Sequence, residues 1–380
     1  MKIDLVITEL HPGGAERCCA SLALYLHRHQ HRVRVLSLGE RSSPAKARLV
    51  EALEGEGIEV QHFGARSISD FPRVRAQLRR AVAADPPELA QAFLWHANLL
   101  SSLVYPGRHI PWIAGVRVVE PRRWRALLSR FWARRTAHVV CVSDEVAQWC
   151  HRAEGVPHSR ISVIPNGVEL PAAQDLNPQG RSPSPEHPGF ASLATRPEPI
   201  LLFVGRMEHQ KGIDQLMLHA ESILQQLPHH RLVLIGDGSW GPRWQAFSER
   251  SRLAHRMEWL GHRSDVSDWM AKSELLLLPT RYEGMPNVVL EAMAHGLPIA
   301  VTRVQGIAEA LGPRLADQSA DAGDWAGWAK LVVGLARDEG LRCELAVANR
   351  QRAETHFALD GILQRYVDLF RSTLDRQRTR

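Results

Sequence analysis

One stretch constrains the fold of this chain more than any other: residues 274–298, with the sequence ELLLLPTRYEGMPNVVLEAMAHGLP. Residues 274–279 are almost purely apolar, which is typical of a strand buried on both faces of a parallel sheet. A helix is predicted next, because Pro286 suits a first helical turn, Gly296 suits a helix end and Pro298 prevents continuation. A buried strand that leads through a polar turn into a helix predicts one repeat of a doubly wound α/β sheet.

The turn between this strand and helix carries polar groups in a place suited to a ligand. Glu283 and Gly284 lie at the carboxyl end of the strand, the edge where open α/β sheets bind ligands. The amides of Gly284, Met285 and Asn287 and the positive end of the helix suit a diphosphate or sugar hydroxyls. Glu291 comes eight residues after Glu283, where a carboxylate can accept two hydrogen bonds from a ribose diol. Either carboxylate alone is more often a solvated or capping residue.

Length and composition fit a soluble protein of two domains. The chain has 380 residues, of which 44% are hydrophobic and 23% charged, and it lacks both a signal peptide and the ~18 apolar residues of a membrane span. Five cysteines without metal-ligand spacing favour a reducing cytoplasm over a disulfide framework. The net charge of +6 leaves nucleic acid, an anionic membrane and phosphate-bearing substrates as candidate partners.

The first half alternates strands and helices and offers two candidate sites. A strand at 2–7 leads through Gly13 and Gly14 into a helix, and such glycines let the backbone approach an anion, although most are only tight connections. His96 follows a strand at 89–93, where an imidazole can bond a sugar hydroxyl or move a proton, or can merely bound a helix. Asn98 is a weaker candidate for the same pocket. Arg117 and Glu120, after the next strand, could also reach it.

The second half begins after a segment rich in proline and serine. A buried strand at 199–204 leads into a loop in which Arg206 and Lys211 are five residues apart. The planar fork of arginine and the point charge of lysine together suit a diphosphate, although such a loop can be an ordinary surface loop. Gly236 ends a later strand in a tight turn, as expected where a backbone borders a nucleotide.

A basic amphipathic helix is predicted over residues 121–138. Its apolar side chains recur at helical spacing, no acidic residue interrupts it, and two are tryptophans, which is typical of an interfacial membrane helix. The alternative is a stripe packed on the sheet with solvated arginines. The stripe comprises Trp124, Leu127, Leu128, Phe131 and Trp132, and the arginines are Arg122, Arg123, Arg125, Arg130, Arg134 and Arg135.

The string around Glu283 and Glu291 resembles the Glu-x7-Glu signature of the family-4 retaining glycosyltransferases, with EGMPN, EAMA and GLP around it. Three further elements are similar to the family: the GGAE turn at 13–16, the G-R-x4-K-G loop at 205–212, and the I-P-N-G-V element at 164–168. Glu169 replaces the usual aspartate after that element, and Gln305 replaces the first glycine of a glycine pair.

The resemblance implies the GT-B fold, in which two doubly wound Rossmann-like domains face each other across a cleft. We expect an acceptor-side domain at 1–170, a proline-rich linker at 171–198, a nucleotide-sugar domain at 199–355, and a last helix at 356–380 that crosses back to the first domain.

The resemblance also assigns roles to residues. Arg206 and Lys211 would hold the nucleotide phosphates, Glu283 would face the donor sugar, His96 would position it and Glu291 would hold the ribose. The expected catalytic residues are therefore Glu283, His96, Arg206 and Lys211, and the expected donor-binding residues are Gly13, Gly14, Arg206, Lys211, Gly236, His262, Gly284, Met285, Pro286, Asn287 and Glu291.

The activity implied by the resemblance is transfer of a sugar from a nucleotide-diphosphate donor with retention of the anomeric configuration. We expect a UDP-sugar donor and a glycan or lipid-linked acceptor of cell-surface polysaccharide or lipopolysaccharide synthesis. The protein itself is expected in the cytoplasm, on the inner face of the membrane. No Asp-x-Asp pair occurs in the sequence, so metal-independent transfer is expected. Two alternatives remain open: epimerase or phosphorylase chemistry on the same fold, and a nonenzymatic binder of nucleotide or nucleic acid.

Overall fold

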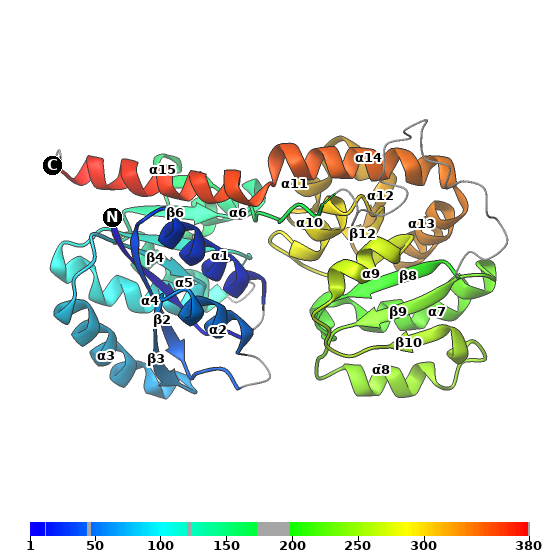
Figure 1. Ribbon diagram of the computed structural model, residues 1–380, viewed down its shortest axis with the longest axis horizontal. Coiled ribbons are helices and arrows are strands. Elements are labelled where there is room, and N and C mark those ends of the chain that lie inside the picture. Colours follow the sequence, from blue (N-terminus) through cyan, green and yellow to red (C-terminus); the bar gives the residue numbers. More distant parts are fainter. Residues whose placement is uncertain (12, 44–46, 120–122, 173–197, 379–380) are drawn as a thin grey trace. The chain divides into compact units, whose positions relative to one another are not determined.

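The chain divides into two compact units. The computed structural model describes residues 1–11, 13–43, 47–119, 123–172 and 198–378 (Figure 1). One unit comprises Met1–Gly167 and Leu359–Arg380, and the other comprises Val168–Ala358. Most of the expected linker, together with Glu120 and Arg122, lies outside the described residues.

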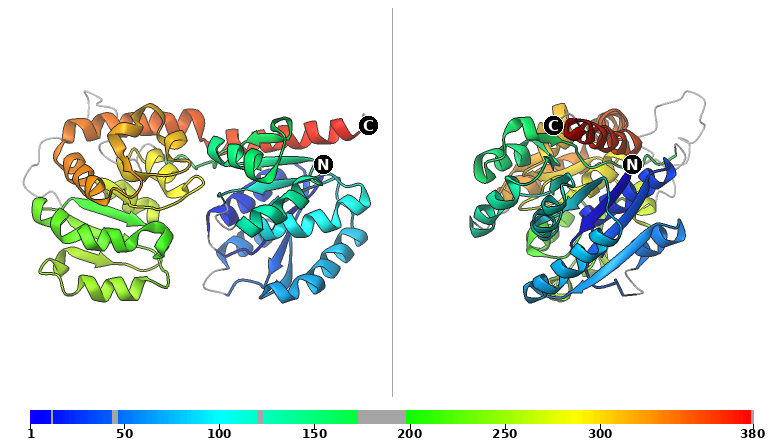
Figure 2. Two further views of the ribbon diagram at one scale, coloured as in Figure 1. Left: turned by 180° about the vertical axis from the view of Figure 1, so that it is seen from behind. Right: turned by 90° about the vertical axis from the view of Figure 1, so that its left-hand side faces the viewer.

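The first unit is a parallel sheet of seven strands in the order β3-β2-β1-β4-β5-β6-β7. Helices cover it, with α1 packed against α2 and α15, and α4 packed against α3 and α5 (Figures 1 and 2). The strands are β1 (Lys2–Ile7), β2 (Arg32–Gly39), β3 (Glu59–Ala65), β4 (Leu89–Phe93), β5 (Trp112–Val116), β6 (His138–Cys141) and β7 (Ile161–Val163). The helices are α1 (Gly14–Arg28), α2 (Arg48–Gly55), α3 (Phe71–Ala84), α4 (Trp95–Val104), α5 (Arg123–Ala133), α6 (Asp144–Trp149) and α15 (Leu359–Arg378).

The last helix belongs to the core of the first unit. Tyr366 and Phe370 of α15 are buried in the same apolar cluster as Ile3 of β1 and Leu22 of α1. Burial of such side chains contributes roughly 1.5–3 kcal/mol each, so the last twenty residues of the described chain stabilise its first strands.

The second unit is a parallel sheet of six strands in the order β10-β9-β8-β11-β12-β13. The strands are β8 (Ile200–Val204), β9 (Arg231–Ile235), β10 (Met257–Trp259), β11 (Leu275–Leu278), β12 (Ile299–Arg303) and β13 (Ser319–Asp321). The helices are α7 (Ile213–Gln226), α8 (Gly241–Ser248), α9 (Val266–Lys272), α10 (Asn287–Ala294), α11 (Ile307–Leu311), α12 (Leu315–Gln318), α13 (Trp325–Arg337) and α14 (Glu339–His356).

Both sheets have the doubly wound order, which confirms the predicted fold class. In each sheet the strand order reverses beside the unit's first strand, between β1 and β4 and between β8 and β11. Loops that leave the carboxyl ends of two such strands diverge to opposite faces, and the crevice between them is where open α/β sheets bind ligands.

The stretch that suggested this fold behaves as predicted except at one residue. All four leucines of β11 are buried, as expected for a central strand. Helix α10 begins at Asn287, and Pro286 precedes the helix rather than lying in its first turn. The φ of Pro286, −75°, would suit a helix, but its ψ of 119° is that of extended backbone, so the helix can begin only at the next residue.

Candidate active site

The predicted diphosphate and sugar residues of the second unit lie at its topological switch point. Arg206 and Lys211 belong to the loop between β8 and α7, and Glu283 belongs to the loop between β11 and α10. Because β8 and β11 are the neighbours at which the strand order reverses, these two loops border the ligand-binding edge of the sheet.

Glycines let the loops at this edge contact one another directly. Gly212 has a φ of +67°, and a Cβ there would lie 1.7 Å from the carbonyl oxygen of Pro279. Gly236 has a φ of +134°, and its Cβ would lie 2.0 Å from the carbonyl oxygen of Gly205. Neither position accepts a side chain without movement of the backbone. The loops after β8, β9 and β11 are therefore fixed relative to one another.

Glu283 is a buried carboxylate held by three donors. Its Oε1 accepts hydrogen bonds from Lys211 Nζ at 2.5 Å and from Thr280 Oγ1 at 2.9 Å. Its Oε2 lies 3.5 Å from Gln210 Nε2. Only 6% of Glu283 is exposed, so its charge depends on these partners. The structure brings the predicted phosphate ligand Lys211 and the predicted sugar residue Glu283 into direct contact.

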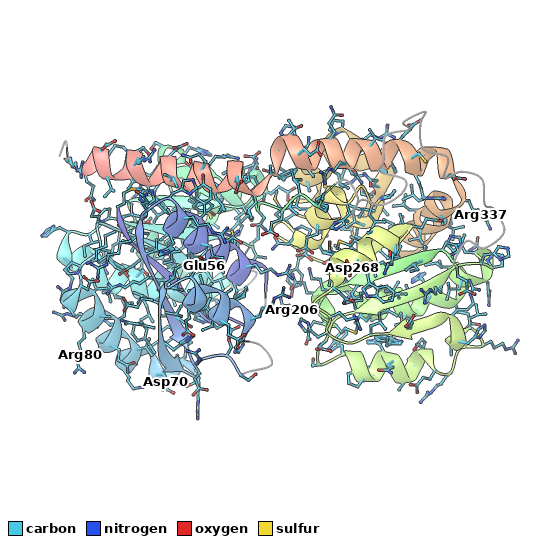
Figure 3. All side chains as sticks on the ribbon, viewed as in Figure 1. Glu56, Asp70, Arg80, Arg206, Asp268 and Arg337 are labelled. Carbon is cyan, nitrogen blue, oxygen red and sulfur yellow. The ribbon has the colours of Figure 1, made fainter. Side chains whose placement is uncertain are left out.

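Arg206 is exposed, in contrast to Lys211. Its side chain projects from the loop after β8 (Figure 3), and Nη2 lies 3.5 Å from Gln210 Oε1, which is at the limit of a hydrogen bond. The guanidinium therefore keeps most of its donors available for an anion. Gln210 connects Arg206 to the Glu283 carboxylate, a role that no sequence pattern indicated.

Arg281 lies in the loop between β11 and α10 and ties it to the loop between β8 and α7 and to the start of α7. Its guanidinium forms a fork with Asp214, at 2.7 and 2.5 Å, and also donates to the carbonyl oxygen of His209 at 2.8 Å. Burial by itself would raise the pKa of the Asp214 carboxyl, but the hydrogen bonds and charge of Arg281 outweigh it and leave that pKa below its usual range. This pair was not among the predicted site residues, since nothing in the sequence links two positions so far apart.

The remaining predicted donor-site residues line the same edge or the helix that follows. Gly284, Met285 and Pro286 are buried between β11 and α10, and Asn287 is the first residue of α10. Glu291 lies further along α10 and is partly exposed, whereas Val288–Leu290 and Ala292–Ala294 are buried. Its carboxylate is thus on the solvent-accessible side of this helix.

Gly236 and His262 follow the next two strands. The Gly236 amide donates to the carbonyl oxygen of Gly261 at 2.8 Å, which ties the loop after β9 to the loop after β10. His262 is exposed next to this contact. Both residues are at the carboxyl edge of the sheet, as predicted.

In the first unit, the predicted residues also lie at a switch point. Gly13 and Gly14 follow β1, and His96 follows β4. Gly13 has extended backbone with a φ of −162°, and a Cβ there would lie 2.2 Å from Oε2 of Glu16, a buried carboxylate. The glycine therefore makes room for Glu16, which is a structural reason for its presence besides any contact with a ligand.

The imidazole of His96 contacts two aromatic rings. Its imidazole makes edge contacts with Phe71 and Trp95, with ring centroids 5.7 and 5.2 Å apart. Leu94, two residues earlier, has a φ of 72° and a ψ of 162°, a conformation that is essentially reserved for glycine and costs about 1–3 kcal/mol. Such strain persists only where surrounding contacts impose it.

Asn98 and Arg117 take structural positions in this unit. The prediction that Asn98 joins the His96 pocket is wrong, because its side chain is buried and both polar atoms bond the backbone of Gly115, at 2.9 and 3.2 Å. Arg117 is partly buried at the end of β5, where it donates to the Asn166 side chain and lies over the Phe93 ring at 5.5 Å.

The amphipathic helix α5 is exposed along most of its apolar stripe. Only Trp132 of the stripe is buried against the sheet, at 0% exposure. The alternative of a stripe packed on the sheet is thus correct for this residue alone. The other four members are Trp124, Leu127, Leu128 and Phe131, which are 49, 63, 45 and 41% exposed.

Within the described part of the chain, no group of three or more histidine, cysteine, aspartate or glutamate side chains could hold a metal ion. In the same residues, no helix is both long enough and apolar enough to cross a membrane.

Two models of protein families match this chain. The model described as "Glycosyltransferase Family 4" matches residues 12–171, and the model described as "Glycosyl transferases group 1" matches residues 198–338. The first match includes the expected GGAE turn and His96, and the second includes the loops that carry Arg206, Lys211, Glu283 and Glu291.

Several characterised proteins are similar to this chain. The UDP-Gal:α-D-GlcNAc-diphosphoundecaprenol α-1,3-galactosyltransferase of Escherichia coli is 28% identical over 47% of this chain and 46% of its own length. The D-inositol 3-phosphate glycosyltransferase of Xylanimonas cellulosilytica is 27% identical over 64% of this chain and 58% of its own length. The chain thus spans about half the length of the curated relatives that it matches.

Solved structures share the fold of the whole chain. The crystal structure of HepE from Anabaena in complex with UDP and glucose has a TM-score of 0.80 at 19% identity, and the match covers 98% of this chain and 100% of that chain. WaaG, described as a glycosyltransferase involved in lipopolysaccharide biosynthesis, has a TM-score of 0.71 at 19% identity and covers 97% of this chain and 99% of that one. At these identities the likeness establishes the fold.

Proposed function

Because this chain consists of family 4 and group 1 glycosyltransferase domains with the GT-B fold, we propose that it transfers a sugar from a UDP-sugar donor and retains the anomeric configuration. The observation that carries the proposal is the cluster of Arg206, Lys211 and Glu283 at the switch point of the second unit. The Escherichia coli relative is named as a UDP-Gal galactosyltransferase and the HepE structure contains UDP, which supports uracil as the base of the donor.

The proposed catalytic effect of the second unit is electrostatic. Departure of the nucleoside diphosphate places negative charge on its leaving oxygen, and Arg206 and Lys211 would stabilise that charge. Lys211 has three N–H donors and uses one for Glu283, so the others remain for phosphate oxygens. Preorganised cations of this kind often supply the largest single contribution to catalysis.

Glu283 would act on the sugar itself. Its carboxylate is held rigidly by Lys211 and Thr280, and it would stabilise the positive charge that develops at the anomeric carbon and ring oxygen. Glu291 would accept two hydrogen bonds from the ribose hydroxyls. The start of α10 from Gly284 to Asn287, together with Gly236 and His262, would border the rest of the nucleotide.

The first unit would supply the remaining donor contacts. Gly13 and Gly14 at the end of β1 and His96 at the end of β4 are the residues proposed for this role. The ring contacts of His96 with Phe71 and Trp95 support it, since they hold the imidazole in one orientation.

The reaction is proposed to need no metal ion.

The acceptor is proposed to be a glycan or a lipid-linked glycan of a cell-surface polysaccharide pathway, at the cytoplasmic face of the membrane. Helix α5 supports this proposal, because four large apolar side chains are exposed there beside Arg125, Arg130, Arg134 and Arg135. An exposed apolar stripe flanked by cations suits an anionic lipid surface. Cosedimentation with anionic vesicles at low salt tests it, and failure to cosediment would contradict it.

The donor is tested by a thermal-shift series with UDP, GDP and ADP and their common sugars, with and without EDTA. A nucleotide at 100 times its dissociation constant should stabilise the protein by about 2.7 kcal/mol. The proposal predicts a shift with UDP ligands that EDTA leaves unchanged. A shift only with another base would refute the UDP donor, and a shift abolished by EDTA would refute metal-independent binding. No shift with any nucleotide would favour the nonenzymatic binder of nucleic acid.

A further inference from the structure

A cluster of aromatic side chains extends from His96 along the surface of the first unit. Trp95 makes an edge contact with His96 and a second one with Trp124, with centroids 5.2 and 5.9 Å apart. The indole of Trp95 is fixed, because its Nε1 donates to Ser129 Oγ at 3.1 Å. The cluster thus joins the start of α4 to the first turn of α5.

Arg125 completes this cluster with hydrogen-bond donors. Its guanidinium carbon lies 4.9 Å from the ring centre of Trp95 and 5.4 Å from that of Trp124. A guanidinium held over aromatic rings keeps its orientation while its N–H groups remain donors in their own plane. Two indoles and one arginine therefore present flat apolar area and polar donors side by side.

Part of this surface is open to solvent. Trp124 is 49% exposed, and Trp95 and Arg125 are partly exposed. The strained backbone of Leu94, with a φ of 72° and a ψ of 162°, immediately precedes Trp95. Strain of this kind gathers at ligand-binding sites.

We propose that Trp95, Trp124 and Arg125 form the subsite that binds the terminal sugar of the acceptor. This inference rests on the proposed function, since it takes His96 as a contact of the donor sugar. The acceptor hydroxyl has to come within about 3–3.5 Å of the reacting carbon, so the acceptor sugar lies beside His96. The cluster is in ring contact with His96 through Trp95.

The chemistry of the cluster fits a saccharide. A pyranose ring has an apolar face of C–H groups and a rim of hydroxyls, and ligand sites match this with aromatic area and a few placed polar groups. The indoles would cover the C–H face, and Arg125 would donate to a hydroxyl. Leu127 and Leu128 are also exposed on α5, and because they have no flat aromatic face they fit lipid better than sugar.

The test is ¹⁹F NMR of the full chain labelled with 5-fluorotryptophan. Signals are assigned with Trp95→Phe and Trp124→Phe, and the protein is titrated with the methyl β-glycosides of glucose, galactose and N-acetylglucosamine while UDP is present. The signals of Trp95 and Trp124 should shift and saturate with at least one glycoside. The signal of Trp328, which is buried in the second unit, should stay in place.

Matched arginine variants show whether the cluster binds the glycoside. Arg125→Gln should weaken glycoside binding about fivefold, as expected for the loss of one hydrogen bond. Arg80→Gln, at an exposed arginine on α3 of the same unit (Figure 3), should leave it unchanged. Equal glycoside binding by wild type and Arg125→Gln would overturn the assignment of Arg125.

The remaining outcomes separate this inference from the proposed function. If Trp95 and Trp124 respond to phosphatidylglycerol–phosphatidylcholine vesicles and to none of the glycosides, the surface binds lipid and the inference is wrong. A lack of response to both probes also overturns it. Release of UDP from a UDP-sugar without acceptor is measured on the same samples. If UDP is released but the glycosides do not shift the tryptophan signals, the inference alone fails. If no UDP is released, the result counts against the proposed function.

Discussion

Nζ of Lys211 lies 2.5 Å from Oε1 of Glu283, and the two side chains are only 14 and 7% exposed. The cation proposed to bind phosphate and the carboxylate proposed to act on the sugar thus hold each other in place. Each of the two charges has the other as its partner.

This contact predicts that loss of one residue destabilises the fold because the other charge is left without its partner. Replacing both residues should restore stability without restoring activity. Glu283→Gln removes the charge that Lys211 pairs with, and breaking such a buried pair costs about 3–5 kcal/mol. The double variant Lys211→Met/Glu283→Gln should recover most of that loss and remain inactive. Chemical denaturation of the single and double variants measures this. Additive losses, with no recovery in the double variant, would show that the contact does not stabilise the fold.

The glycine at the start of α7 should be indispensable to the donor site. An alanine at Gly212 would place its Cβ 1.7 Å from the Pro279 carbonyl oxygen and push apart the loops that carry Lys211 and Glu283. We expect Gly212→Ala to cost about 2–4 kcal/mol of stability and to weaken binding of UDP. The control is Gly323→Ala, where φ is +87° but no atom lies within 4 Å of the Cβ position. If both variants lose the same stability and both keep UDP binding, close contact is not the reason for Gly212.

Arg281 should affect the rate of sugar transfer without touching the donor. The loop with Glu283 is held to the loop with Lys211 by the Arg281–Asp214 fork, whose members are 19 and 13% exposed. Arg281→Gln should lower kcat for release of UDP at least about tenfold, since about 1.4 kcal/mol of lost transition-state stabilisation has that effect, with a smaller change in KM. Arg281→Lys should recover part of the rate.

The matched control for Arg281 is another arginine fork. Arg41 pairs with both carboxylate oxygens of Glu54 at 2.7 and 2.6 Å in the first unit, but both side chains are exposed. Arg41→Gln should leave kcat and KM unchanged. An equal fall of kcat in both variants would mean that the Arg281 fork has no special role at the site.

The first unit should lose stability in mild acid because of His138. Burial, together with the charges of Arg376 and Arg160, lowers the pKa of this imidazole to about 4. The unfolded state has a pKa of about 6.5 and so binds the proton first. The contribution of neutral His138 to the free energy of unfolding is therefore complete above pH ~6.5. It is lost as the pH falls towards ~4, and the loss is on the order of 2–3 kcal/mol.

Denaturation at several pH values in this window measures the effect. His138→Gln should flatten the dependence of stability on pH, whereas His255→Gln, at an exposed histidine, should not. An unchanged slope in His138→Gln would contradict the assignment.

The sequence predicted the fold well because both units repeat one local pattern. Buried runs such as Leu275–Leu278 and the punctuation by Gly296 and Pro298 are local signals, and they suffice to identify strands and helices in a doubly wound sheet. The misplacement of Pro286 by one residue came from its ψ, which the sequence does not reveal. The motifs around Arg206, Lys211 and Glu283 predicted ligand-binding loops after two of these strands, and the strand order of the structure places the two loops at the switch point.

The parts that the sequence could not predict depend on contacts between distant positions. Asp214 and Arg281 pair across two loops, and Gln210 connects Arg206 to Glu283 only because those loops are in contact. The helical stripe of α5 did not reveal that Trp132 alone is buried, since periodicity identifies a face but not its neighbours. The positive φ of Leu94 likewise has no sequence signature, since leucine rarely adopts it.

The central claim is that this chain cleaves the sugar–diphosphate bond of a UDP-sugar without a metal ion, using Arg206, Lys211 and Glu283. The most direct measurement is release of UDP from UDP-glucose, UDP-galactose and UDP-N-acetylglucosamine in EDTA, for wild type and Arg206→Gln. We predict turnover of at least one donor by wild type, and a fall of about 10²–10³-fold in Arg206→Gln, as expected when a group that stabilises transition-state charge is removed. No turnover of any UDP-sugar, or equal rates in both proteins, would contradict the account.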